Sequence, residues 1–246
     1  MESFVALDLE LTPFGGDQQR IIEIAAARFR GGQLVDTFCT LVDPRCDLTP
    51  RVGALTGICQ KEVNAAPRLA EVVPSFLGFV GNDPVVGQSI NLDLECLAAA
   101  GIRLFNPLLD TFELASLLLP GLPSYDLGTI ARSLGVVVEQ EHRALGDALV
   151  AGRVFLALLD RAAGLGLPVL TQVNSLAAQL PAWPFARLFR EAQRRRLKNH
   201  FATQHSALST QHPTPRNPTS SRRRFGPLRG HPSTPHRTRC RWIPTS

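Results

Sequence analysis

The stretch Phe4-Val5-Ala6-Leu7-Asp8-Leu9-Glu10 is an apolar run in which acids appear only at the end. Such a run predicts a buried strand that delivers carboxylates to one edge of a sheet. Asp8 and Glu10 are two residues apart, so in a strand their side chains share a face, about 7 Å apart. Two carboxylates so placed repel each other unless a cation lies between them, although a D-x-E pair at a strand end also arises often by chance.

Two more strands and a series of helices are expected after this first strand. Residues 20–29 and 34–42 are strand candidates, and Arg30-Gly31-Gly32-Gln33 between them has the length and chemistry of a hairpin turn. After a turn-rich stretch, short apolar segments alternate with segments of helical periodicity. The pattern predicts an α/β fold, a mixed β-sheet flanked by helices, that ends near residue 163. The expected helices span residues 68–80, 92–100, 112–119 with Thr111 as N-cap, 125–134 and 144–163, and short strands are expected at 85–86 and within 104–109.

Two further acids and one histidine stand out in the predicted helices. Asp93 falls in the first turn of a helix that follows a strand, where an acid also complements the helix dipole. Asp147 lies between Leu145 and Leu149 in an otherwise apolar helix, where a lone carboxylate is costly unless it is paired or binds a metal. His142 is the only histidine before residue 200, and it precedes Asp147 by five residues. A group that titrates near neutral pH is what the activation of a water molecule requires.

In this order, D-x-E, then Asp, then H-x4-D, the sequence resembles the DEDDh group of 3′-to-5′ exonucleases, typified by the proofreading epsilon subunit. The resemblance covers about residues 3–163 and implies a ribonuclease H-like fold. Motifs beyond the acids also carry it. They are Leu55-Thr56-Gly57-Ile58, Leu109-Asp110-Thr111, and Tyr125-Asp126-Leu127 followed by Leu134-Gly135.

The resemblance implies a role for each of the five matching positions. Asp8, Glu10, Asp93 and Asp147 would hold two divalent metal ions, and His142 would be the general base. The chemistry agrees, because hydrolysis of a phosphodiester needs a strong nucleophile and relief of charge on the leaving 3′ oxygen. Two ions about 4 Å apart serve both needs. Carboxylate oxygens select Mg²⁺ or Mn²⁺ over softer metals.

The sequence departs from the family pattern where the family seats the terminal nucleotide. Leu11 stands where the family usually has threonine, Thr12 is retained, and Gln88 and Ser89 replace a usual His-Asn pair. These four residues are the expected substrate-binding positions. Their departures bear on substrate preference and rate more than on metal binding.

The leading hypothesis is a metal-dependent 3′-to-5′ exonuclease that acts on the 3′ ends of single-stranded DNA, with a polymerase or a helicase as its partner. An RNA-trimming exonuclease is the first alternative. The same fold and ligands serve RNA, and we identify no residue that would recognise the 2′-hydroxyl and so distinguish RNA from DNA. A non-catalytic module that binds nucleic acid or a partner protein on an exonuclease-like scaffold is the second. Retention of all five catalytic positions argues against that second alternative.

Charge divides the chain into two unlike parts. Residues 1–185 carry 12 Lys and Arg against 20 Asp and Glu, whereas residues 186–246 carry 14 against a single acid. We expect an exonuclease domain over residues 1–164, a linker or short helical segment over 165–198, and a disordered basic tail over 199–246, which has no acid and no periodicity. Such a tail either raises nonspecific affinity for nucleic acid or is the product of a frameshift or truncation.

The cysteines and the hydropathy bear on the cellular compartment. The five cysteines are odd in number and contain no C-x-x-C pair, which excludes a readable disulfide framework or zinc site. The N-terminus has no readable signal peptide, and no apolar run approaches the roughly 20 residues that span a bilayer. We therefore expect a cytoplasmic protein that does not associate with membranes.

Overall fold

The structure is a computed structural model that describes residues 2–12, 19–138, 142–180 and 182–209, with side chains described as far as residue 198. Its strands are β1 (Ser3–Leu11), β2 (Ile21–Arg30), β3 (Gln33–Leu41), β4 (Val85–Gly87) and β5 (Leu108–Asp110). Its helices are α1 (Pro50–Thr56), α2 (Gln60–Asn64), α3 (Leu69–Val80), α4 (Asn91–Ala99), α5 (Thr111–Leu118), α6 (Leu127–Ser133), α7 (Ala144–Ala163), α8 (Leu167–Ala177) and α9 (Ala186–Ser209).

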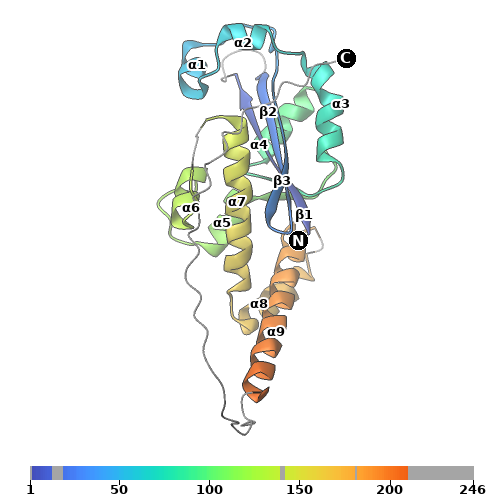
Figure 1. Cartoon of the computed structure of the whole chain (residues 1–246), viewed down its shortest axis with the longest axis vertical. Coiled ribbons are helices and arrows are strands. Elements are labelled where there is room, and N and C mark those ends of the chain that lie inside the picture. The colour runs from blue at the N-terminus through green and yellow to red at the C-terminus, as the bar shows by residue number, and fades with distance from the viewer. Residues whose placement is uncertain (1, 13–18, 139–141, 181, 210–246) are drawn as a thin grey trace, which may run out of the picture.

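A five-stranded mixed sheet forms the centre of the fold, in the order β3-β2-β1-β4-β5 (Figure 1). β1, β2 and β3 pair antiparallel to one another, whereas β4 pairs parallel to β1 and β5 parallel to β4. The predicted α/β fold with a mixed sheet is therefore confirmed. Because β1 and β4 are parallel, their carboxyl ends lie at the same edge of the sheet, and α4 begins at this edge.

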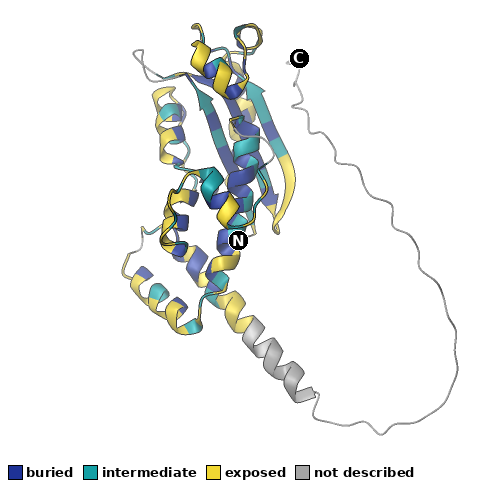
Figure 2. Cartoon of the chain, turned by 90° about the vertical axis from the view of Figure 1, so that its left-hand side faces the viewer, coloured by how far each residue is buried: buried dark blue, intermediate teal, exposed yellow. Residues whose placement is uncertain are grey.

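The residues of β1 alternate between two cores, one on each face of the sheet. Phe4 packs in the core formed with α5 to α9, and Val5 packs in the core formed with α3 and α4. The buried strands between these helices can be followed in Figure 2. The same alternation places Asp8 and Glu10 on the face of Phe4, which is the face that α7 covers.

A close contact with β2 holds α7 on this face. Gly152 of α7 packs against the ring of Phe29, and a Cβ atom added at Gly152 would lie 2.3 Å from that ring. Phe4 stacks on Phe29 with ring centroids 5.0 Å apart and meets Phe155 of α7 edge-on, also at 5.0 Å. A glycine at position 152 therefore lets the helix approach the sheet closely, which brings Asp147 in its first turn beside β1.

Two features of the region before β4 and after β5 differ from the sequence prediction. The turn-rich stretch after Pro44 contains α1 and α2, and α1 begins with an N-cap by Thr49 and a proline at its first position. The N-cap of α5 is Asp110, whose side chain accepts a hydrogen bond from Phe112 N. The prediction that Thr111 caps this helix is therefore wrong, and Thr111 is the first helical residue.

The segment after α7, expected to be a linker or a short helical segment, forms the two helices α8 and α9. α8 and α9 pack into the same core as α7, through Phe185 and Phe189 among other residues. Trp183 stacks on Phe189 with centroids 5.4 Å apart. α9 continues to Ser209, so the first eleven residues of the predicted disordered tail are helical. The rest of that tail, residues 210–246, lies outside the described residues.

No single helix in the described part of the chain is both long and apolar enough to cross a bilayer. α7 and α8 meet those criteria only as a pair, and the pair is bent by 110°.

Candidate active site

Three of the predicted ligands meet at one edge of the sheet. Asp8 and Glu10 come from the carboxyl-terminal half of β1, and Asp147 comes from the first turn of α7. Each offers a carboxylate oxygen, and these three oxygens lie within 4.8 Å of one another. Residues 8 and 147 are therefore brought together by the packing of α7 on the sheet.

Asp93 lies beside this group without being one of the three. It stands in the first turn of α4, is 8% exposed, and accepts a hydrogen bond at Oδ1 from the backbone N–H of Leu9, over 3.1 Å. The bond fixes the start of α4 to the residue between Asp8 and Glu10. All four predicted ligands thus lie around the end of β1.

The carboxylates carry a large electrostatic cost in the absence of a cation. Burial, followed by the charges of Asp93 and Asp147, raises the pKa of Asp8 well above its ordinary value. Burial and the charge of Asp147 raise the pKa of Glu10 from 4.5 to about 7, and burial raises the pKa of Asp93 from 3.8 to about 7. A divalent cation relieves both the repulsion and the desolvation, and a donor set made only of carboxylates suits Mg²⁺ or Mn²⁺.

His142 lies at the entrance to α7 in a strained backbone conformation. Its φ is +60°, in the left-handed region that non-glycine residues seldom adopt, and the residue is exposed. Its backbone N–H donates to Asp147 Oδ2 over 3.1 Å. This bond ties the predicted base to a predicted metal ligand. Strained residues of this kind persist where the surrounding structure over-determines them, often at functional sites.

A buried ion pair next to His142 was not predicted from the sequence. Glu23 of β2 is 1% exposed, and its carboxylate accepts hydrogen bonds from Arg143 Nη2 at 2.6 Å and Arg143 Nε at 3.0 Å. The backbone N–H of Ala144 donates to the same carboxylate over 3.1 Å. Glu23 itself was the sequence signal for this pair, because it is an acid inside an otherwise apolar predicted strand and a buried carboxylate needs a partner.

The predicted substrate-binding residues of β1 lie directly after the carboxylates. Leu11 is partly buried at the end of the strand. Thr12 is buried, and its hydroxyl accepts a hydrogen bond from Arg20 N over 2.9 Å, while its own N–H donates to the carbonyl of Arg20 over 2.8 Å. Thr12 thus closes the connection to β2. A binding role for these two residues stays a prediction.

The other two predicted substrate-binding residues follow β4. The Gln88 side chain donates to the Tyr125 carbonyl over 2.7 Å and accepts from the Thr111 hydroxyl over 2.6 Å, so it links three segments of the domain. Ser89 has a φ of +50°, and its N–H donates to Asp110 Oδ1 over 3.0 Å. Their contacts within the protein explain why polar residues stand here, and their role in binding stays a prediction.

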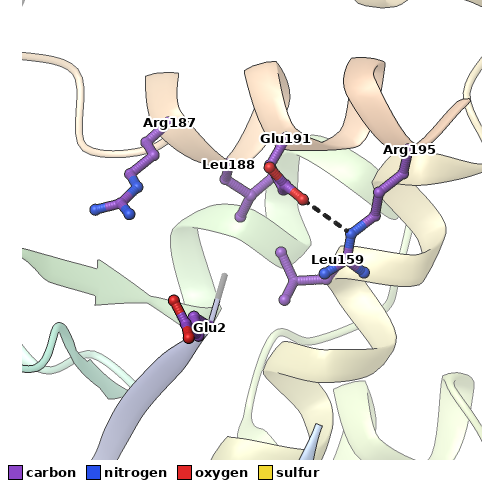
Figure 3. Close-up of a pocket in the computed structure, with 6 residues that line it drawn as sticks. All are labelled: Glu2, Leu159, Arg187, Leu188, Glu191 and Arg195. Atoms are coloured by element: carbon purple, nitrogen blue, oxygen red, sulfur yellow. Dashed lines mark hydrogen bonds and ion pairs between the residues drawn. The ribbon is translucent and has the colours of Figure 1, made fainter. Parts of the chain in front are cut away.

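A cavity of about 320 Å³ lies away from this site, beside Glu2 at the start of β1 (Figure 3). Arg187, Glu191 and Arg195 of α9 line it, and Glu191 pairs with Arg195 across one helical turn at 3.4 Å. None of the predicted catalytic residues lines this cavity. The carboxylate cluster therefore lies outside this pocket.

Comparison with known proteins finds similarity over the described domain. Residues 5–155 match a protein family described as Exonuclease. The DNA polymerase III subunit epsilon of Aquifex aeolicus (strain VF5) is 36% identical over 163 residues, which cover 64% of this chain and 81% of that protein. A PolC-type DNA polymerase III of Clostridium perfringens is 38% identical over 151 residues, 60% of this chain. The chain spans only 10% of the length of that PolC-type relative.

A solved structure of exonuclease X in complex with 5′-overhanging duplex DNA has the same fold. It superimposes with a TM-score of 0.54 at 21% sequence identity, covering 65% of this chain and 92% of that chain. The sheet and the helices around it are therefore shared, while the sequence identity is low.

Proposed function

The chain belongs to the exonuclease family that residues 5–155 match, as the DEDDh motifs indicated, and on that premise we propose that it hydrolyses phosphodiester bonds at the 3′ ends of single-stranded DNA. The observation that carries this proposal is the convergence of Asp8, Glu10 and Asp147 within 4.8 Å, with Asp93 beside them. Such a cluster on the edge of a sheet, next to an exposed histidine, suits metal-dependent hydrolysis of a charged polymer.

Asp8, Glu10, Asp93 and Asp147 would hold two divalent ions, Mg²⁺ or Mn²⁺. When bound, the ions lower the pKa of the attacking water and stabilise negative charge on the leaving 3′ oxygen. Asp93 keeps Oδ1 directed to Leu9 N, which fixes the carboxylate against β1. The raised pKa values of Glu10 and Asp93 mean that loading of the site requires these groups to release protons near neutral pH.

His142 would accept the proton of the attacking water at one of its imidazole nitrogens. Its exposure gives the ring access to both solvent and substrate, and its link to Asp147 keeps it at the entrance to the carboxylate cluster. A histidine is suited to this step, because a neutral imidazole nitrogen can accept a proton from a water molecule in the transition state.

DNA as the substrate, and a replicative polymerase as the partner, are supported by the relative from Aquifex aeolicus, which is named as a subunit of DNA polymerase III. Single-stranded 3′ ends are the substrate form that the resemblance to the DEDDh exonucleases implies, and the test below compares them with duplex DNA. α1 and α2 lie at the upper end of the molecule in Figure 1.

The proposal is tested with 5′-labelled single-stranded DNA, duplex DNA and RNA of one sequence, each with Mg²⁺, Mn²⁺ or EDTA. We expect a ladder of shortened products from single-stranded DNA, no reaction in EDTA, and no reaction with Asp147→Asn. Faster degradation of the RNA would establish the exoribonuclease alternative. Binding without cleavage under every metal condition would establish a non-catalytic module.

A further inference from the structure

The Glu23–Arg143 ion pair joins the strand next to β1 to the residue that follows His142. Glu23 on β2 lies directly opposite Glu10 on β1 in the register of the sheet. Residues opposite each other on paired strands share a face, so Glu23 points to the side that α7 covers. The pair therefore connects the predicted base to the strand pair that carries two predicted ligands.

The geometry of this pair is rigid. Arg143 makes two parallel hydrogen bonds to Glu23, Nε to Oε2 at 3.0 Å and Nη2 to Oε1 at 2.6 Å. A guanidinium engaged through both arms of its fork is held in orientation as well as in position. Because Glu23 is 1% exposed, water does not compete for its oxygens. The backbone of Arg143 is consequently anchored immediately after His142.

Glu23 also supplies the N-terminal cap that α7 otherwise lacks. Arg143 is the N-cap residue, but its side chain makes no capping hydrogen bond. Glu23 Oε2 accepts from Ala144 N over 3.1 Å, so a carboxylate from β2 satisfies one of the free N–H groups of the helix. Its negative charge also complements the positive end of the helix dipole. One carboxylate thus holds two consecutive residues, 143 and 144.

His142 needs such an anchor. It is exposed, its backbone is left-handed, and its N–H donates a hydrogen bond to Asp147. A general base must stay within hydrogen-bond reach of the water that it deprotonates, and a displacement of about 1 Å can reduce the rate about 10²-fold.

We propose that Glu23 and Arg143 are positioning residues that hold His142 in its working place through the bidentate bond and the cap on α7. The inference rests on the proposed function, in which His142 is the general base. Glu23 is not itself a ligand in this view, because its two oxygens are engaged by Arg143 and Ala144. The Glu23–Arg143 pair affects catalysis only through the position of His142.

A double-mutant cycle tests the inference with full-length protein, Mn²⁺ and single-stranded DNA. Arg143→Ala is expected to lower kcat about 10- to 100-fold while KM changes less than about 2-fold. In a His142→Ala background the same substitution is expected to lower kcat less than about 2-fold further, since the residue it positions is absent. Arg143→Lys, which keeps the charge but loses the fork, is expected to recover only part of the rate.

Two further variants test whether a general loss of structure explains the fall in kcat. Glu23→Gln is nearly isosteric and keeps an acceptor for Ala144 N, so it tests the pair if Arg143→Ala does not fold. Asp83→Asn breaks the other arginine–acid pair of β2, Arg28 with Asp83, away from the carboxylates. We expect Asp83→Asn to lower Tm without lowering kcat. An equal fall of kcat in this control would overturn the inference, because general destabilisation would then explain the effect.

Other results separate the inference from the proposed function. If His142→Ala lowers kcat but Arg143→Ala and Glu23→Gln do not, the positioning role is wrong and the general base stands. If the effects of Arg143→Ala and His142→Ala multiply, or if KM rises while kcat is kept, Arg143 acts on the substrate or the fold rather than through His142. A normal rate for His142→Ala would instead contradict the proposed general base.

Discussion

The backbone N–H of His142 lies 3.1 Å from Asp147 Oδ2 and donates a hydrogen bond to it. The proposed base and a proposed ligand therefore belong to one short structural unit at the start of α7. A substitution of Asp147 that removes the acceptor also releases the backbone of His142. Asparagine keeps an acceptor oxygen at this position, so Asp147→Asn separates loss of the ligand charge from loss of this bond.

Removal of a ligand carboxylate should abolish activity without unfolding the protein. Asp8→Asn, Asp93→Asn and Asp147→Asn are each expected to lower kcat by at least about 10³-fold, because metal-assisted steps contribute several kcal/mol. Each should also raise the Tm of the metal-free protein, since one repelling charge is gone. Glu95→Gln on the exposed side of α4 is the matched control, with kcat kept. More than about a tenth of the wild-type rate would remove that residue from the ligand set.

The metal-free protein should lose stability as the pH rises. The folded-state pKa values of Glu10 and Asp93 are raised to about 7, above the values of the unfolded chain. The folded state therefore binds more protons between about pH 4 and pH 7, and the contribution of these groups to stability is lost across that window as pH rises. Thermal melts in EDTA from about pH 5 to pH 8 measure the slope. Glu10→Gln should flatten it, and an unchanged slope would contradict the raised pKa of Glu10.

Saturating Mn²⁺ should reverse this loss. A ligand that binds only the folded state stabilises it by RT ln(1 + [L]/Kd) and so raises Tm. The gain should be larger at about pH 8 than at about pH 5, where protons compete for the carboxylates. Melts with and without Mn²⁺ at both pH values measure the difference. An equal gain in Tm for wild type and Asp147→Asn would place the ion outside the carboxylate cluster.

Substitution of His142 should impair turnover and spare metal binding. His142→Ala is expected to lower kcat about 10²- to 10⁴-fold, the usual range for loss of a positioned base. His142→Gln should resemble alanine, because an amide orients water but does not take its proton. The Mn²⁺-dependent rise in Tm measures metal binding in both variants. Near-normal rates in both would show that no histidine is needed for the reaction.

Gly152→Ala in α7 should destabilise the domain, whereas Gly78→Ala in α3 should not. The added Cβ would lie 2.3 Å from the Phe29 ring, so α7 must shift or the ring must move, at a cost of about 1–3 kcal/mol. Gly78→Ala in α3 is the control, because its Cβ meets nothing within 4 Å and alanine favours a helix. Urea unfolding of both variants measures the difference, and an equal stability for the two would contradict the close packing of α7.

The sequence predicted the sheet and the placement of Asp8 and Glu10 on one face of β1, because both depend on short-range patterns. The period of two in residues 4–10 placed Asp8 and Glu10 on one face, and the apolar periodicity of residues 144–163 predicted α7 with the bounds it has. The helices α1 and α2 were missed, because their few apolar residues stand among turn formers. Thr49 followed by Pro50 was the signal that could have located α1.

Contacts between residues that are far apart in the sequence could not be predicted from it. Glu23 and Arg143 are 120 residues apart, so neither position alone reveals the pair. The docking of α9 was hidden for a different reason. Its basic residues dominate the composition, while the apolar residues that bury in the core with α7, among them Leu188 and Phe189, are few in a polar stretch. Burial depends on the partner surface, and that surface is assembled from elements far away in the chain.

The proposed ligands come from β1, the start of α4 and the start of α7, which are separated by most of the domain's length. During synthesis, a nascent chain that has reached α4 carries Asp8, Glu10 and Asp93 but lacks Asp147 and His142. The proposed metal site is therefore completed only when α7 has emerged and docked. Nuclease activity would thus be withheld from every nascent chain that still lacks α7.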